Sequence, residues 1–197
     1  MTEYEKMLAG EWYLPCDPEL AALHQRAVAL CYAANHLPPE REEERMELLR
    51  PLFGKTGAEF TITPDFHCDY GGNITLGEGF YANYNLVILD CAPVTFGDNV
   101  LVGPGCGFYT AIHPLDAAHR ATGEEKAAPI TVGSDVWFGG NVTVLPGVTI
   151  GDGAVIGAGS VVTRDIPPGV VAAGNPCRVL RPVDQEQVRP VDQEQAP

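Results

Sequence analysis

Several features that mark other protein classes are missing from this 197-residue sequence. Its six cysteines include no CxxC pair, which argues against a zinc site and a disulfide framework. No apolar run approaches the roughly 18 residues that span a bilayer, and the acidic opening Met1–Glu5 does not resemble a signal peptide. We therefore expect a cytoplasmic protein whose thiols are reduced and mostly buried (Cys16, Cys31, Cys68, Cys91, Cys106 and Cys177).

Positive charge is scarce as well. The net charge of −14 argues against nucleic acid or an anionic membrane as the main partner. Between Thr56 and Thr163 the only basic residues are Arg120 and Lys126. Common catalytic motifs are also absent: there is no GxSxG elbow, no P-loop and no GxGxxG after a strand. Direct attack by a substrate hydroxyl that a histidine activates is the simplest chemistry left.

What the sequence does contain is a six-residue repeat. A bulky apolar residue, usually followed by Gly, recurs every six positions, and a second apolar or small residue follows four positions later. The first set is Val132, Phe138, Val144, Ile150, Ile156 and Val162; the second is Val136, Val142, Val148, Ala154, Ser160 and Ile166. This period predicts a parallel β-helix, in which three hexapeptides form one triangular turn and the apolar residue points inward. A Gly/Val-rich β-sandwich is the alternative, but chance would rarely keep phase through six units.

The repeat begins earlier but less regularly. Leu76, Ala82 and Ile88 are in phase, the register then shifts by two residues, and Phe96 and Val102 resume it. From 111 to 129 the pattern fails. Long excursions from compact domains are uncommon and often functional, so we expect a functional loop there.

The N-terminal part differs from the repeat. Apolar residues at helical spacing predict a helix over 18–32, with Asp17 as N-cap and Pro18 in the first turn, and a second helix over 40–53. The charged run 40–45 is expected to be a solvated face. We divide the chain into a helical segment (1–55), a β-helix (56–181) and a tail (182–197). The tail contains the tandem repeat 181–188 and 189–196, too polar to fold, and we expect it to be frayed and without function.

Two groups of side chains are candidates for chemistry. His113 lies at the base of the excursion, before Pro114, which biases His113 toward an extended backbone. A single histidine is more often a surface or core residue, but a neutral imidazole on a loop of a rigid scaffold can act as a general base. Arg164, Arg178 and Arg181 arrive together at the end of the repeat. They serve either solubility and carboxylate pairing or the phosphates of a ligand whose acyl end lies near His113.

These residues resemble the maltose/galactoside O-acetyltransferase group of hexapeptide-repeat acyltransferases, which includes the nodulation-type sugar acetyltransferases. The resemblance runs from about residue 3 to residue 181. It rests on the segments 6–13 (KMLAGEWY), 66–71 (FHCDYG), 80–85 (FYANYN), 97–99 (GDN), 113–114 (HP), 129–133 (PITVG), 136–140 (VWFGG), 146–152 (PGVTIGD) and 174–176 (GNP).

The resemblance implies a left-handed parallel β-helix with an N-terminal two-helix segment. It also implies a homotrimer with active sites between subunits, acetyl-CoA as donor and no metal. His113 would be the general base. Asp17, Arg26, Asp69, Asn83 and Asp90 would line the acceptor pocket, Asn83 also near the donor's acetyl end. Gly140, Ala158, Thr163, Arg164, Arg178 and Arg181 would bind the donor, with the Gly140 N–H as oxyanion donor. Trp137 would pack beside the donor or fill the core.

Some family members carry Ser at the position of Asp69 and an acid at that of Cys91, so the acceptor stays open. The leading hypothesis is acetyl transfer to a maltose-, glucose- or galactoside-like hydroxyl. Alternatives are another hydroxyl acceptor (an antibiotic or serine), a metal-dependent hydratase with His67, His113 and His119 as ligands, and a non-catalytic trimeric scaffold.

Overall fold

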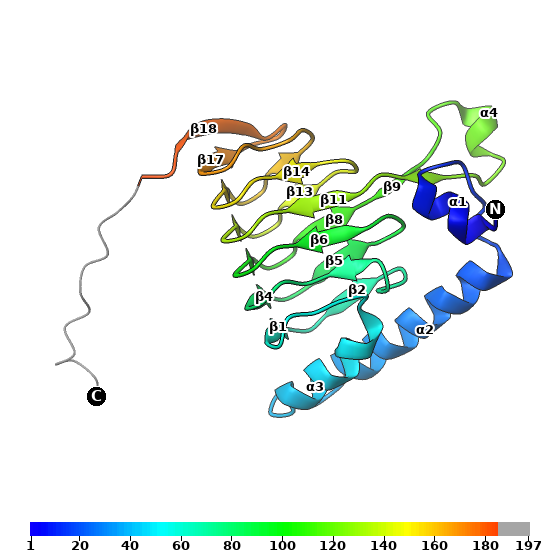
Figure 1. Cartoon of the computed structure of the whole chain (residues 1–197), viewed down its shortest axis with the longest axis horizontal. Coiled ribbons are helices and arrows are strands. Elements are labelled where there is room, and N and C mark those ends of the chain that lie inside the picture. Colours follow the sequence, from blue (N-terminus) through cyan, green and yellow to red (C-terminus); the bar gives the residue numbers. More distant parts are fainter. Residues whose placement is uncertain (185–197) are drawn as a thin grey trace.

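The computed structural model describes residues 1–184 and shows a parallel β-solenoid of about six turns (Figure 1). Its strands form three faces. The first face contains β1 (Phe60–Ile62), β4 (Phe80–Ala82), β7 (Leu101–Val102), β12 (Trp137–Phe138), β15 (Val155–Ile156), β17 (Val170–Ala173) and the antiparallel β18 (Arg178–Pro182). The second contains β2 (Phe66–Cys68), β5 (Leu86–Leu89), β8 (Gly107–Tyr109), β13 (Thr143–Val144) and β16 (Val161–Val162). The third contains β3 (Ile74–Thr75), β6 (Val94–Phe96), β11 (Ile130–Val132) and β14 (Thr149–Ile150).

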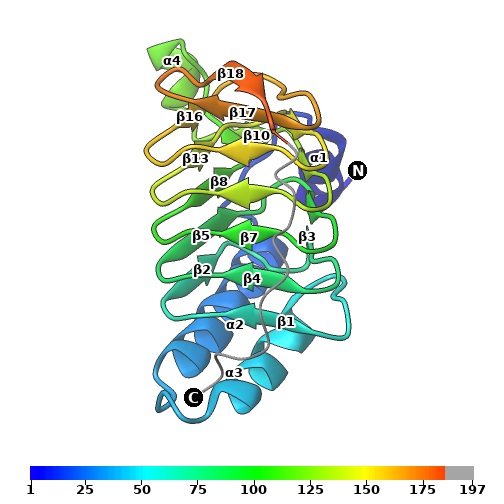
Figure 2. The ribbon, with the colours of Figure 1, turned by 90° about the vertical axis from the view of Figure 1, so that its left-hand side faces the viewer.

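The predicted hexapeptide-repeat β-helix is confirmed, together with the direction of its side chains. Every member of both apolar sets is at most 5% exposed, and Leu76, Ala82, Ile88, Phe96 and Val102 are buried in the same core. Successive turns add a stack of phenylalanine rings (Phe80, Phe96, Phe108 and Phe138) with centroids 4.9–5.2 Å apart. Edge-to-face rings at this spacing stabilise each turn against the next. Figure 2 shows the strands of the first face one above another.

The turns differ in length, and within the described residues the difference falls at the same corner each time. Ile74 pairs with Val94, 20 residues later, in the first turns; Thr131 pairs with Thr149, 18 residues later, after the excursion; and Val155 pairs with Val171, 16 residues later, in the last turn. The extra residues lie between the second and third faces, around the connections 69–73 and 90–93: Ile88 and Thr95 are seven residues apart, whereas Val144 and Thr149, at the same positions of a later turn, are five apart. The excursion leaves between β8 and β11, at the same corner. We call this corner, between the second and third faces, the irregular edge. The corner between the first and second faces is the regular edge.

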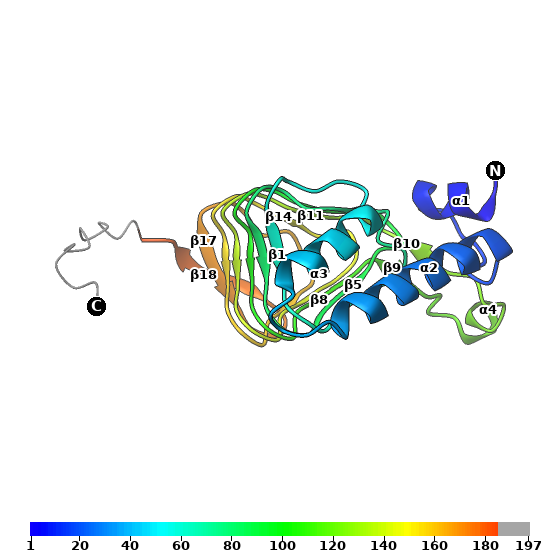
Figure 3. The ribbon, with the colours of Figure 1, turned by 90° about the horizontal axis from the view of Figure 1, so that it is seen from below.

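The helical segment has more elements than the two helices expected. It contains α1 (Glu3–Ala9), α2 (Pro18–Asn35), α3 (Glu42–Leu49) and a 3₁₀ turn, η1 (Arg50–Leu52). The first predicted helix is confirmed, with the Asp17 carboxylate accepting the Glu19 N–H. The second is shorter than predicted, because Pro51 cannot continue an α-helix. Figure 3 shows α2 and α3 across the end of the first coil, where their apolar side chains join the solenoid core.

The interpretation of the charged run 40–45 as a solvated face is wrong at one position. Arg45 is only 4% exposed, and its guanidinium donates to the carbonyls of Ala34, Leu37 and Pro38. These carbonyls lie at the end of α2, where helical acceptors lack partners. Arg45 therefore caps one helix with a side chain from the next.

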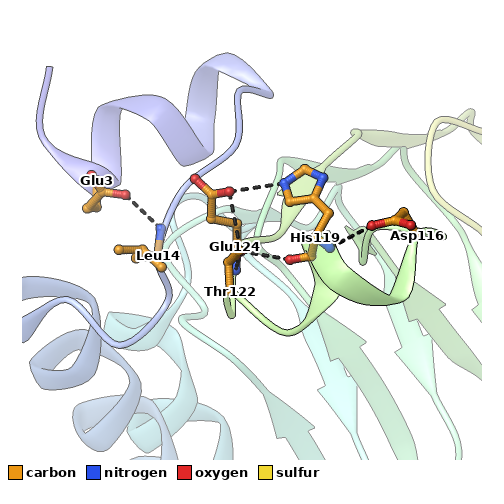
Figure 4. A network of polar contacts seen from close by, with 6 residues as sticks. All are labelled: Glu3, Leu14, Asp116, His119, Thr122 and Glu124. Atoms are coloured by element: carbon orange, nitrogen blue, oxygen red, sulfur yellow. Dashed lines mark hydrogen bonds and ion pairs between the residues drawn. The ribbon is translucent and has the colours of Figure 1, made fainter.

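The excursion is not an irregular loop. It is a two-stranded antiparallel ribbon, β9 (Ala111–Ile112) and β10 (Lys126–Ala127), with a short helix, α4 (Ala117–Arg120), at its tip. The Glu124 carboxylate lies 3.0 Å from His119 Nε2, and Asp116 accepts the His119 backbone N–H (Figure 4). The Trp12 ring lies 4.6 Å from the His119 ring, so the segment between α1 and α2 packs on the excursion.

The cysteines are mostly buried, as predicted. Cys16 is exposed and the other five thiols are buried and unbridged. In residues 1–184 no helix has the length and apolarity to cross a membrane. The duplicated tail from residue 185 onward lies outside the described residues, so the expectation for it stays a prediction.

Candidate active site

A pocket of about 440 Å³ opens at the irregular edge, between α2, the excursion and the longer connections of the first turns. Its walls come from Pro15, Ala21, His24, Gln25, Asp69, Tyr70, Leu89, Cys91, Ala111, His113 and Glu125. The volume is that of a small-molecule site. Among the described residues that line it, none is Lys or Arg.

Asp69 supplies a carboxylate to the pocket wall. Its Oδ2 accepts the Cys91 thiol proton at 3.4 Å, and the His24 Nδ1 donates to its backbone carbonyl at 3.0 Å. The pKa of Asp69 is raised to about 6, chiefly by burial; the Cys91 thiol and His24 lower it, and the Asp90 and Glu125 charges raise it. Asp69 therefore has an acceptor oxygen facing the pocket that a bound hydroxyl can use.

Asp90 lies behind this wall and is fully buried. Its carboxylate accepts the backbone N–H groups of Asp69, Tyr70 and Asn73 at 2.8–3.3 Å. These bonds fix the connection 69–73 in its longer form. Burial raises the pKa of Asp90 although the N–H groups oppose it. The structure thus places Asp90 beneath the pocket, where it shapes the loop that presents Asp69.

His113 follows β9 directly and projects into the pocket mouth, with 61% of its side chain exposed. Its Nε2 lies 3.6 Å from Oε2 of Glu125, which precedes β10 on the other strand of the ribbon. Glu125 is 8% exposed. A buried carboxylate beside an imidazole attracts the positive charge that the imidazole gains with a proton.

Sequence reasoning missed Glu125. It stands in the excursion next to Glu124, which is a surface partner of His119, and nothing in the sequence separates the two. The useful signal would have been cross-strand pairing in an antiparallel ribbon. Because Lys126 pairs with Ile112, the residues just outside β9 and β10, His113 and Glu125, lie opposite each other.

The regular edge holds a second group of candidates. Asn83 follows β4, Gly140 follows β12 and Ala158 follows β15, so the three lie at the corner where the first face turns into the second, Gly140 level with Ala158 and Asn83 one residue earlier in the corner. Within residues 1–184 the Gly140 N–H makes no backbone hydrogen bond. The backbone turns there through left-handed residues with φ of 57–71° (Asn85, Gly105, Asn141 and Gly159), a region that favours Gly and Asn.

The two edges do not meet within one chain. Asn83 precedes β5 and His113 lies beyond β8, which pairs with β5 so that Leu89 is opposite Tyr109. The four residues of β5 lie between them, and their extended length alone is about 10 Å at 3.3 Å per residue. The structure therefore does not bring Asn83, Gly140 or Ala158 to His113 of the same chain.

The residues predicted to bind the nucleotide end of the donor also lie at both edges. Thr163 and Arg164 follow β16 at the irregular edge, and both are exposed. Arg178 and Arg181 lie on β18, where Arg178 pairs with Ala173 near the regular edge. Arg181 makes an ion pair of 2.7 Å with Asp184. Trp137 lies on the outer side of the first face and is 54% exposed, so it does not fill the core.

The remaining candidates are not among the residues that line the pocket. Asp17 caps α2, and the Arg26 guanidinium donates to the Pro51 carbonyl at 2.9 Å. His67 is exposed on β2, and His119 pairs with Glu124. Within residues 1–184 no three His, Cys, Asp or Glu side chains are placed to hold a metal ion.

The sequence is similar to those of known acetyltransferase families. Residues 6–57 match the family description "Maltose acetyltransferase hexapeptide capping motif", and residues 129–164 match "Bacterial transferase hexapeptide (six repeats)". Nodulation protein L of Rhizobium meliloti is 48% identical over 178 residues, which is 90% of this chain and 97% of that protein.

Solved structures are also similar. A maltose O-acetyltransferase from Clostridium difficile 630 superposes with a TM-score of 0.92 at 45% identity, covering 94% of this chain and 99% of the other. A galactoside acetyltransferase in complex with coenzyme A gives 0.90 at 43% identity, covering 93% and 92%.

Proposed function

Because the chain belongs to the hexapeptide-repeat acetyltransferases of the maltose/galactoside O-acetyltransferase type, we propose that it moves an acetyl group from acetyl-CoA to a sugar hydroxyl. The acceptor would be maltose-, glucose- or galactoside-like. The observation that carries the proposal is the His113–Glu125 pair at the mouth of a polar pocket.

His113 acts as the general base. It takes the proton of the acceptor hydroxyl while the hydroxyl oxygen attacks the acetyl carbonyl carbon. The carbonyl–oxygen bond forms, a tetrahedral intermediate collapses, and the carbon–sulfur bond breaks. The imidazolium then returns the proton to the leaving thiolate. The Glu125 carboxylate, 3.6 Å away, stabilises the imidazolium between these steps.

The acceptor is held from the solenoid side. Asp69, which lies on the loop that Asp90 fixes, accepts a hydrogen bond from a second hydroxyl of the acceptor. Among the described residues, the pocket wall has two carboxylates, Asp69 and Glu125, and no Lys or Arg. An acceptor with its own carboxylate, such as serine, would be repelled there. This favours a neutral sugar over the serine alternative.

Donor binding would use the regular edge. The Gly140 N–H, without a backbone acceptor in residues 1–184, is suited to stabilise the oxyanion of the tetrahedral intermediate. Arg178 and Arg181 on β18, with Thr163 and Arg164, offer donors for the phosphates and the nucleotide.

A complete site would then need two copies of the chain. The proposed residues of each copy stand on two edges, at opposite ends of the strands of the second face. A homotrimer brings the irregular edge of one subunit against the regular edge of the next and forms equivalent sites between subunits.

The test is His113→Ala assayed by CoA release with a panel of sugars, antibiotics and serine as acceptors. We expect a loss of about 10³-fold in kcat with an unchanged melting temperature. His36→Ala, at the far end of α2, is the control and should keep full activity. Near-wild-type turnover in His113→Ala, or no CoA release with any acceptor, contradicts the proposal.

A further inference from the structure

We propose that Tyr13 is a positioning residue for the reaction, acting on His113 through Glu125. The inference rests on the proposed function, because it concerns the same general base. It adds a contribution from the segment between α1 and α2, which lies far in sequence from the excursion. The segment would then orient a catalytic group as well as pack against the excursion.

Tyr13 is joined to Glu125 by both its backbone and its side chain. The Tyr13 N–H donates to the Glu125 carbonyl at 2.9 Å, and the Glu125 N–H donates to the Tyr13 carbonyl at 3.0 Å. The Tyr13 hydroxyl, fully buried, donates to Oε1 of the same glutamate. The antiparallel bridge continues the β9–β10 ribbon by one more segment.

The two oxygens of Glu125 therefore have different partners. Oε1 receives the Tyr13 hydroxyl, and the Cys91 thiol lies 3.9 Å from it. Oε2 is the oxygen that lies 3.6 Å from His113 Nε2. Holding one oxygen fixes the rotation of the carboxylate, so the other stays directed at the imidazole.

The electrostatic surroundings keep Tyr13 in the donor state. Burial raises the pKa of Tyr13 far above its usual range, and the neighbouring Cys91 and Glu125 act in the same direction. Burial likewise raises the pKa of the Cys91 thiol. Neither group becomes an anion at neutral pH, so neither repels the carboxylate it contacts.

The segment that carries Tyr13 is itself held to the excursion. The Trp12 ring contacts His119 and lies 5.1 Å from the Lys126 ammonium, and the Glu3 carboxylate accepts the Leu14 N–H at 2.6 Å. Figure 4 shows Glu3 and Leu14 beside the excursion side chains. Tyr13 is thus placed by its neighbours on both sides.

A purely structural role is the competing explanation. Tyr13 belongs to a small core cluster with Met7, Leu20, Cys91, Ala92 and Ala127, so any change there affects packing. A useful test must keep the ring and must read catalysis separately from stability.

Tyr13→Phe meets this requirement because it removes only the hydroxyl. We expect kcat to fall about ten-fold, with the KM for acetyl-CoA unchanged. The matched control is Tyr4→Phe, which alters a half-buried tyrosine packed against the same cluster and should leave kcat unchanged. Thermal unfolding of each variant defines an assay temperature at which all are folded.

A double-mutant cycle with Glu125→Gln decides the route of the effect. If Tyr13 acts through Glu125, Tyr13→Phe costs little further activity once Glu125→Gln is present. Wild-type kcat in Tyr13→Phe, or losses that multiply in the double variant, overturns the inference. Wild-type kcat in Glu125→Gln would instead remove the proposed role of Glu125 itself, and a fully active His113→Ala would remove the proposed function.

Discussion

The regular and irregular edges of the solenoid are built from the same repeat and differ in nearly everything else. At the regular edge four successive turns close with a short corner through Gly or Asn in the left-handed region. At the irregular edge the chain inserts 69–73, 90–93 and the whole excursion. The regular edge presents backbone groups and small residues, and the irregular edge presents carboxylates, a thiol and an imidazole.

The comparison shows how a rigid scaffold acquires a site. The turns above and below keep their phase, because the inward residues stay buried whatever the corner does. Polar side chains can therefore be added at a corner without a cost to the core. The donor and acceptor halves of the proposed site are then separated by the width of one face.

The most direct way to break this comparison is to disable one edge in each of two variants. Asn83→Ala and His113→Ala should each lose about 10²- to 10³-fold in activity. If each site takes one edge from each of two subunits, mixed trimers made by co-refolding equal amounts should regain about a quarter of wild-type activity. The measurement is CoA release before and after mixing.

An equal mixture of His113→Ala with wild type should keep about half of wild-type activity whether or not subunits exchange, so it calibrates the assay, and exchange itself is read from the masses of the mixed trimers. No recovery in the Asn83→Ala and His113→Ala mixture, with exchange demonstrated by mass, would show that each site is contained in one subunit. It would also remove the reason for treating the two edges as halves of one site.

The second prediction tests the scaffold that both edges share. Ile156 is fully buried in β15, and its neighbour Val155 faces outward. Ile156→Ala should lower the free energy of unfolding by about 3 kcal/mol through lost burial and a residual cavity. Val155→Ala should cost well under half of that. Equal losses in urea unfolding would contradict the inward assignment of the repeat.

Much of the scaffold was predictable, because a period of six is a strong and local signal. The inward residues, the two-residue register shift and the place of the excursion all follow from it. The register shift proved to be the connection 90–93, next to the candidate pocket. A departure from periodicity was thus a better pointer to the site than any single residue type.

The contacts that depend on distant segments were not predictable. Arg45 is buried because the end of α2 offers carbonyls to it, and the charge pattern of 40–45 does not contain that information. Glu125 is buried because Tyr13, 112 residues earlier, pairs with it. Tertiary pairing of this kind leaves no trace in local periodicity.

The third prediction concerns the carboxylate of the irregular edge. Asp69→Asn keeps the size of the side chain and removes its charge, so the KM for the acceptor should rise about ten-fold, which is the loss of one charged hydrogen bond. The same variant should be more stable at pH 7, by up to about 3 kcal/mol, because the buried carboxylate is costly to ionise. Glu59→Gln, exposed and distant from the pocket, is the charge-matched control.

The pH dependence fixes the sign of the stability effect. The folded-state pKa of Asp69 is about 6, above the ordinary value of 3.8, so the folded protein holds a proton that the unfolded chain has lost between these values. The stability linked to this proton is present below about pH 4 and is lost as the pH rises through 6. Asp69→Asn should therefore gain its advantage over wild type across that window. An advantage that does not change between pH 4 and pH 7 would contradict the assignment.

The smallest effect is expected for a substitution of Gly140 at the regular edge. A Cβ on Gly140 would lie 3.3 Å from the Pro104 carbonyl oxygen, a contact that a shift of a few tenths of an ångström relieves. Gly140→Ala keeps the N–H but moves it, and a proposed oxyanion donor is sensitive to such displacement. We expect kcat to fall about three- to ten-fold with little change in the melting temperature or in the acceptor KM. Since the acceptor pocket lies on the other edge, a rise in acceptor KM without a fall in kcat would show that the two edges do not divide the work as proposed.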